Sequence, residues 1–170
     1  IFGNASDPAG LTSRRWNGAA WGSPAVISSS LLGIQNWEVV RDDAVLGLEQ
    51  VVVDTDDDLS TSADWEVYAG TWGGAVWSSL TRLTNDESVD WGVHATYGPD
   101  GRPAIGWLRD SAVVGVVGDL GQPPEVWLDA TNKVGLEFVN GGLAAGAGKP
   151  SRPGLSARRA RFSGEEQCDK

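Results

Sequence analysis

Short apolar runs, each followed by a polar or glycine-rich turn, recur along almost the whole chain. The runs "AVLGLEQVVVDT", "DWEVYAGTW", "VHATYGPDGRPAIGWLRD" and "AVVGVVGD" are rich in Val, Trp and Tyr, which favour β-strands. Turn sequences such as "TDDDLSTSAD", "WGG", "GPDGRP" and "DLGQPP" separate them. No stretch shows a 3.6-residue apolar period with helix caps. The pattern therefore predicts an all-β protein with almost no helix.

The apolar runs group into two units of four strands each. We expect strands at the following positions: 36–41, 44–53, 65–72 and 76–83 in the first unit, and 91–97, 103–109, 112–118 and 125–130 in the second. Residues 98–101, Gly-Pro-Asp-Gly, predict a hairpin turn, because Pro presets one turn torsion and Gly tolerates a positive φ. Four antiparallel strands per unit are typical of a propeller blade.

A pair of tryptophans marks the same place in successive units. Trp16 and Trp21 recur 56 residues later as Trp72 and Trp77, and Trp127 is a weaker third echo. A repeat of roughly 50 residues is typical of propeller blades and solenoids. Repetition at matching positions predicts that these indoles pack in the core or between blades, and sugar stacking is the alternative.

The pattern "TWGGAVWSSLTRLTND…VDWGVHATYGPDGRPAIGWLRD" resembles the repeats of bacterial β-propeller proteins. In those repeats a Trp-containing hairpin precedes the outer strand and an Asp-Gly turn joins the two inner strands. The resemblance covers about residues 12–145 and implies a half blade, two full four-stranded antiparallel blades and a second half blade. We expect residues 1–11 to form an N-terminal lead and residues 146–170, rich in Pro, Arg and Ser, to form a flexible tail.

An incomplete ring of blades exposes sheet faces and strand edges that have to be covered. The strands after Val134 in one copy would complete the blade that residues 16–28 begin in another. Two copies would then close a six-bladed ring with two-fold symmetry, the commonest oligomer symmetry. The sequence therefore predicts a homodimer.

Charge narrows the range of other partners. The chain carries a net charge of −10. Residues 151–170 are net positive by +2, which leaves −12 on residues 1–150. This field repels phosphate backbones, which argues against nucleic acid, and it favours cations; an acidic surface that maintains solubility is the alternative. The longest apolar run, 112–118, is too short to cross a bilayer.

Residue counts exclude several kinds of chemistry. Cys168 is the only cysteine, which rules out an intramolecular disulfide and a cysteine metal cluster. One His and no Gly-x-Ser-x-Gly motif argue against serine-hydrolase chemistry and multi-His zinc sites. Because Met is absent, we expect the numbered chain to begin after processing or inside a longer gene. Oxygen ligands remain, and they suit a divalent cation, with calcium favoured.

One candidate cation site is the acidic segment "DTDDD". Asp54, Asp56 and Asp58 alternate as they do at the start of a calcium loop. The sixth position is Leu59 where an EF-hand has Gly, and the twelfth is Trp65 where an EF-hand has Glu. A solvated turn is the alternative interpretation of this segment.

The favoured site is a ring of polar residues at the starts of the inner strands. Asn36, Asp90 and Asn140 fall at comparable points of successive units, where side chains would converge on a central channel. This arrangement resembles the way calcium-dependent propeller hydrolases of the lactonase and phosphotriesterase type hold a metal at the channel mouth. With period-2 alternation His94 shares a face with Asp90, so these two residues are the catalytic candidates. The alternative is that they cap strand ends and satisfy backbone groups.

Three functions are compatible with these patterns. The first is a self-assembling propeller piece that acts as a ligand-binding scaffold for a small molecule. The second is a metal-dependent hydrolase of phosphoesters or lactones. The third is a fragment without a selected activity of its own. Metal dependence separates the second function from the first.

Overall fold

The computed structural model describes residues 10–31, 33–42, 49–56, 64–129, 135–139, 142–146 and 158–159. These residues form strands, turns and bends. The described part of the chain contains no helix, and therefore none that could cross a membrane. The strands are, in chain order, β1 (Leu11–Ser13), β2 (Ala25–Ser28), β3 (Ile34–Arg41), β4 (Glu49–Thr55), β5 (Glu66–Trp72), β6 (Thr81–Arg82), β7 (Asp90–Tyr97), β8 (Pro103–Arg109), β9 (Ala112–Val117), β10 (Glu125–Asp129), β11 (Gly135–Val139), β12 (Gly142–Gly146) and β13 (Arg158–Arg159).

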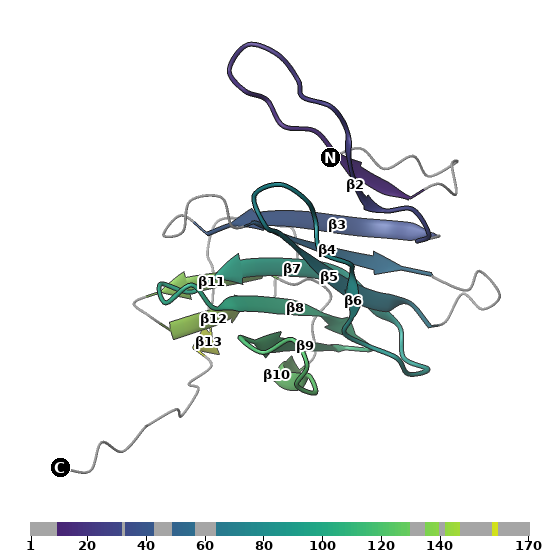
Figure 1. The fold of residues 1–170 in the computed structure, drawn as a ribbon. Coiled ribbons are helices and arrows are strands. Elements are labelled where there is room, and N and C mark those ends of the chain that lie inside the picture. Colours follow the sequence, from purple (N-terminus) through teal and green to yellow (C-terminus); the bar gives the residue numbers. More distant parts are fainter. Residues whose placement is uncertain are drawn as a thin grey trace, which may run out of the picture.

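These strands form four antiparallel sheets, and neighbours in each sheet are also neighbours in the chain (Figure 1). The first sheet is β1–β2, the second is β3–β4–β5–β6, the third is β7–β8–β9–β10 and the fourth is β11–β12–β13. The predicted all-β class and the two antiparallel four-stranded units are confirmed. The largest difference is in the last strand of the first unit, which shrinks to the two residues of β6.

The tryptophan repeat is also a repeat of backbone structure. Trp16 and Trp21 face each other across the β1–β2 hairpin, and Trp72 and Trp77 do so across the β5–β6 hairpin. In both pairs the ring centroids lie 5.5 Å apart, with the planes inclined by 58° and 61°. The same backbone hydrogen bond closes both hairpin tips, at 3.2 and 3.1 Å. The β1–β2 hairpin is therefore the structural equivalent of β5–β6.

The second sheet is buried on both faces, which explains the continuous apolar run of β4. Val51 and Val53 pack toward the first sheet with Leu11 and Ile27. Val52 packs on the opposite face, toward the third sheet. The core between the second and third sheets consists of Val52, Val67, Ala69, Val93, Ala95, Ile105, Trp107, Val114 and Val116.

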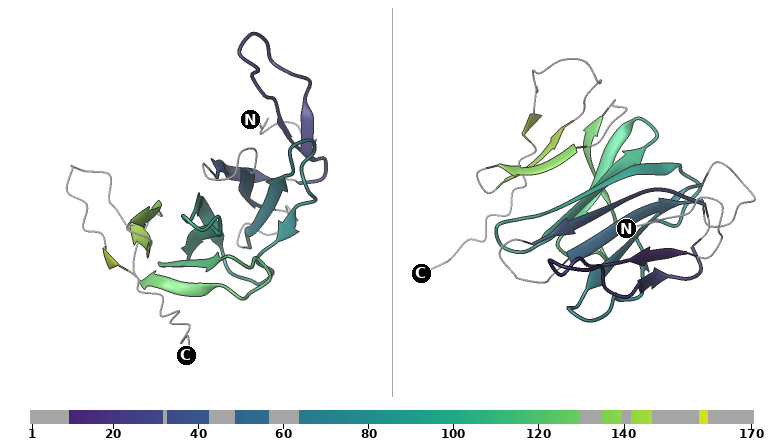
Figure 2. Two further views of the ribbon diagram at one scale, coloured as in Figure 1. Left: turned by 60° about the vertical axis from the view of Figure 1, so that its left-hand side comes forward. Right: turned by 90° about the horizontal axis from the view of Figure 1, so that it is seen from above.

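The four sheets follow one another along an arc in chain order, as the left view of Figure 2 shows. Among the described residues this arc stays open and forms no closed ring. The first strands of successive sheets lie next to one another: β7 contacts β3, and β11 contacts β7. Most of the predicted lead and tail lies outside the described residues; within the tail, β13 pairs with Ala144 and Ala145 of β12.

Candidate functional site

The predicted site residues at the starts of β3 and β7 lie in two separate hydrogen-bonded pairs. Asn36 in β3 lies opposite Asp54 in β4, and its side-chain amide donates to both carboxylate oxygens of Asp54 at 3.1 and 3.0 Å. Asp90 in β7 lies opposite Arg109 in β8. The third predicted member, Asn140, lies outside the described residues.

Asp54 is fully buried and joins the second sheet to the third. Its carboxylate accepts hydrogen bonds from the backbone of Asn36 (2.8 Å), Gly92 (2.6 Å) and Val93 (3.3 Å). Gly92 and Val93 lie where the register of β7 shifts, and Gly92 has a φ of 68° that favours glycine. This bulge turns two amides out of the β7–β8 ladder and toward the carboxylate.

Burial raises the pKa of the Asp54 carboxyl above its ordinary value of 3.8, and the hydrogen bonds from Asn36, Val93 and Gly92 partly offset that rise. Of the other two predicted ligands in the acidic segment, Asp56 alone is among the described residues. The backbone amide of Asp56 donates to the carbonyl of Gly33 at 3.2 Å, and Asp58 lies outside the described residues.

Asp90 is also fully buried, and protein donors bind both of its carboxylate oxygens. Trp107 Nε1 donates to Oδ1 at 2.9 Å, and Arg109 donates to Oδ1 and Oδ2 at 2.8 and 2.6 Å. Arg109 extends further to the exposed Asp86 at 2.9 Å. Burial raises the pKa of Asp90, although the hydrogen bonds and positive charge of Arg109 oppose the shift. A guanidinium therefore neutralises this carboxylate where the sequence pattern predicts a cation.

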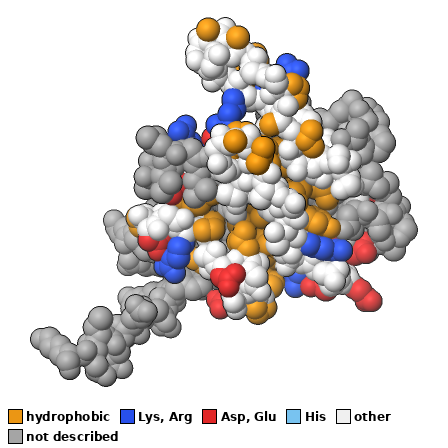
Figure 3. Space-filling model, viewed as in Figure 1, with side chains coloured by type: hydrophobic (Ala, Val, Ile, Leu, Met, Phe, Trp, Pro, Cys, Tyr) orange, Lys and Arg blue, Asp and Glu red, His pale blue; other side chains and the backbone are white. Residues whose placement is uncertain are grey.

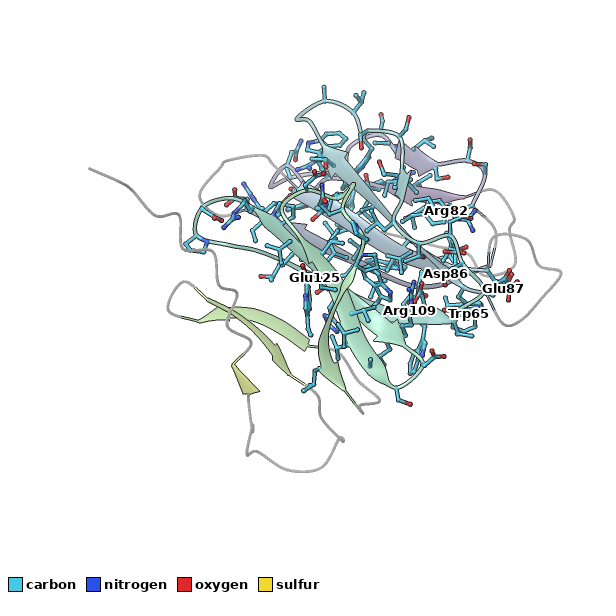
Figure 4. The ribbon with its side chains drawn as sticks, turned by 90° about the horizontal axis from the view of Figure 1, so that it is seen from below. Trp65, Arg82, Asp86, Glu87, Arg109 and Glu125 are labelled. Carbon is cyan, nitrogen blue, oxygen red and sulfur yellow. The ribbon has the colours of Figure 1, made fainter. Side chains whose placement is uncertain are left out.

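A second buried carboxylate, Glu66 at the start of β5, lies in the same region. Thr84 Oγ1 donates to Glu66 Oε2 at 2.5 Å, and Arg82 forms an ion pair with Oε1 at 2.8 Å. Burial raises the pKa of Glu66, and the negative charge of Asp90 contributes to that rise. Figure 4 shows Arg82, Asp86 and Arg109 gathered at this end of the sheets. The sequence pattern gave no reason to select Glu66, Arg82 or Arg109. An unbroken hairpin register with Tyr97 opposite Pro103 would place Trp91 opposite Arg109, and the bulge in β7 is what brings Asp90 there.

His94 lies away from Asp90, and the predicted shared face is wrong. The bulge after Trp91 adds one residue to β7, so Asp90 lies opposite Arg109 and His94 lies opposite Gly106, on different faces of the third sheet. His94 Nδ1 instead lies 3.0 Å from Glu38 Oε2 of β3, which also accepts the Ala95 amide at 2.8 Å.

Glu38 and Asp54 together bind the first strand of the third sheet to the second sheet. Burial opposes ionisation of Glu38, but the hydrogen bonds from His94 and Ala95 and the charge of His94 outweigh it, so the pKa of Glu38 falls below 4.5. In the described part of the chain, no group of three or more His, Cys, Asp or Glu side chains has an arrangement that could hold a metal ion. The calcium site remains a prediction.

The residues that directly follow Asn36 and Asp90 are both exposed tryptophans. Trp37 in β3 is 41% exposed and Trp91 in β7 is 37% exposed. Trp37 lies opposite Val53, on the face of the second sheet toward the first sheet, whereas Trp91 lies opposite Leu108, on the face of the third sheet away from the second. An exposed indole offers an apolar ring face together with one polar N–H group. Each indole is therefore a separate exposed surface suited to aromatic stacking.

Comparison of this chain with protein-family models, with curated proteins and with solved structures finds no significant match to any of them.

Proposed function

We propose that the sheets are blades of a β-propeller, that two copies of the chain close one ring, and that the assembled ring is a scaffold for binding a small molecule. The observation that carries this proposal is the pair of incomplete sheets. The β1–β2 hairpin is the equivalent of β5–β6, the last two strands of a unit. The described residues contain no counterpart of β3–β4 beside it.

The fourth sheet begins with the two strands that the first sheet lacks. β11 and β12 form an antiparallel hairpin that follows the third sheet, as β7 and β8 follow the second. β11 contacts β7 and β8, so the hairpin stacks where the first two strands of a further blade would lie. β11–β12 of one copy and β1–β2 of the other would form one four-stranded blade.

The short strand β13 occupies the edge at which the two copies would join. Arg159 and Arg158 pair with Ala144 and Ala145 of β12. In the complete second sheet, β4 pairs with β5. Because β12 is the equivalent of β4 and β1 is the equivalent of β5, β1 of a second copy would pair with the same edge of β12. Assembly therefore displaces β13, and only two residue pairs have to be broken.

The ligand-binding part of the proposal rests on the exposed indoles of Trp37 and Trp91. Each lies on the first strand of its sheet, but Trp37 is on the face of the second sheet toward the first sheet, and Trp91 is on the face of the third sheet away from the second. A ring closed by two copies would contain four such indoles as separate stacking surfaces. Aromatic stacking is the chemistry that this arrangement favours.

Hydrogen–deuterium exchange at two protein concentrations tests the assembly, with sedimentation velocity run on the same samples. Amides of β1 (Leu11–Ser13) and β12 (Gly142–Gly146) should gain protection together as dimer forms, because β1 gains a partner at its open edge and β12 exchanges the two residue pairs with β13 for pairing with β1. Amides of β8 (Pro103–Arg109) lie inside a complete sheet and serve as the internal control. A chain that stays monomeric across the concentration range contradicts the proposal.

The same samples, measured by native mass spectrometry with and without EDTA, separate the scaffold from the hydrolase. A scaffold keeps its mass and oligomeric state when the chelator is added. Loss of a stoichiometric divalent cation would favour the metal-dependent hydrolase, with Asn36, Asp90 and Asn140 as ligands. A chain that forms no dimer and binds neither metal nor ligand would match the fragment without a selected activity.

A further inference from the structure

The outer face of the β1–β2 hairpin is the most apolar exposed surface near the start of the described chain. Trp16 is 53% exposed, Trp21 is 58% exposed and Val26 is 60% exposed. Val26 points outward, because its neighbours Ala25 and Ile27 pack on the second sheet. Figure 3 shows this hairpin projecting from the body of the molecule with hydrophobic side chains at its surface. We call Trp16, Trp21 and Val26 the outer tryptophan face.

The repeat shows how an equivalent face is covered when a sheet precedes it. Trp72 and Trp77 have the same ring geometry but are only 7% and 9% exposed, because the β1–β2 hairpin lies over them. Trp77 Nε1 donates to Ser13 Oγ at 2.9 Å. The Arg15 guanidinium lies 4.4 Å from the centre of the Trp72 ring, within cation–π distance. The covering element is a β-hairpin that supplies a hydroxyl acceptor and a guanidinium.

We propose that the outer tryptophan face docks on β9–β10 of a second copy of the chain. This inference rests on the proposed function, because closing a ring places the third sheet of one copy before the β1–β2 hairpin of the other. In each stacked pair of sheets the preceding sheet covers the next, as the first sheet covers the second.

The proposed docking surface on β9–β10 is partly open within one copy. Trp127 and Leu128 of β10 are half-buried and pack against Leu108 and Val113. β11 stacks on the β7–β8 part of the third sheet. The β9–β10 part of the same face lies next to β11. The Trp127 ring lies over Gly115, where an added Cβ would stand 2.3 Å from it. The Trp127 ring and Leu128 are therefore the apolar groups against which a second indole pair would pack.

Charge complementarity fixes the orientation of the two surfaces. Glu125 pairs with Gly115, so it lies on the same face as Trp127, and it is exposed. Figure 4 shows Glu125 apart from the cluster of Arg82, Asp86 and Arg109. Arg14 is exposed and lies two residues before Trp16, hence on the outer tryptophan face. Docking brings Arg14 of one copy to Glu125 of the other.

The size of the surface is consistent with one part of a larger interface. A fully buried Trp removes about 150–250 Å² from water, so two half-exposed indoles contribute roughly that area in total. A stable interface buries about 800 Å² on each partner. Strand pairing between β1 and β12 would supply the remainder.

Sedimentation velocity of a W16S/W21S variant tests the inference. The dimer dissociation constant should rise by at least about 100-fold, because central indoles are typical hot spots. The matched control is Val76→Ser, which removes an exposed apolar side chain from the tip of the equivalent β5–β6 hairpin and should leave the constant within about 3-fold. Near-ultraviolet circular dichroism checks that both variants stay folded.

Charge reversal gives a second measurement that does not alter the core. R14E and E125R should each weaken the dimer about 10-fold, and the R14E/E125R double variant should recover most of the loss. A wild-type dimer that W16S/W21S leaves intact would overturn the docking inference but leave ring closure standing. A wild-type chain that is monomeric throughout would overturn ring closure itself, and the docking with it.

Discussion

The most informative single change is Asp54→Ala, because one carboxylate connects three strands in two sheets. Asp54 is fully buried, and its carboxylate accepts hydrogen bonds from the backbone amides of Asn36 in β3 and of Gly92 and Val93 in β7. Removing it takes the acceptor from at least two short, partly buried hydrogen bonds, those of the Gly92 amide at 2.6 Å and the Asn36 amide at 2.8 Å. Hydrogen bonds to a charged group contribute about 1.5–3 kcal/mol each.

Two such bonds correspond to about 3–6 kcal/mol. Burying the charged carboxylate is itself unfavourable, which is why its pKa is raised, and removing that desolvation cost offsets part of this loss. We therefore expect the free energy of unfolding to fall by about 3 kcal/mol. Asp54→Asn should cost less, because its amide oxygen still accepts one of the β7 amides.

Urea unfolding followed by tryptophan fluorescence measures the loss, since nine tryptophans report on the sheets. The control is Asp100→Ala, which removes an exposed ion pair with Arg102 and should cost less than about 1 kcal/mol. Exchange of the Gly92 and Val93 amides should accelerate only in the Asp54 variants. An Asp54→Ala protein within 1 kcal/mol of wild type, with an unchanged m-value, would refute the argument that this carboxylate holds the two sheets together.

Three further changes test the packing and the electrostatics. Gly115→Ala should lower the free energy of unfolding by about 1–3 kcal/mol, because the new Cβ would stand 2.3 Å from both the Ile105 carbonyl oxygen and the Trp127 ring; thermal melts check this, and an unchanged Tm contradicts it. Ser13→Ala should cost about 1–3 kcal/mol by leaving the buried indole N–H of Trp77 without its acceptor, whereas Ser13→Thr should recover most of the loss in urea titrations. Burial and the negative charges of Asp42 and Glu49 raise the pKa of Tyr97 from 10.0 to about 12. The folded state therefore holds this proton more tightly than the unfolded chain, and the resulting stability is present below pH 10 and lost as the pH rises toward 12. Ultraviolet titration of wild type against Tyr97→Phe should show a phenol midpoint near 12, and a midpoint near 10 would contradict the burial.

Local patterning was sufficient to predict the strands and their grouping. Runs rich in Val and Trp and the Gly-Pro-Asp-Gly turn act through short-range preferences, so the two four-stranded units emerge from the sequence, with the largest boundary error at β6, where two residues replace the predicted 76–83. The tryptophan repeat predicted equivalent hairpins for the same reason, since each pair meets across its own turn. The different burial of the two tryptophan pairs was not predictable, because a neighbouring sheet is what covers Trp72 and Trp77.

The polar sites depended on long-range geometry that the sequence alone does not carry. Asn36 and Asp90 were correctly placed near strand starts, but their partners, Asp54 and Arg109, are set by the register between strands. A single bulge in β7 moved His94 to the opposite face from Asp90 and turned two amides toward Asp54. Alternation along the chain determined which residues form strands and hairpins; bulges and sheet stacking, which arise only when distant segments meet, decided which charged groups are buried together.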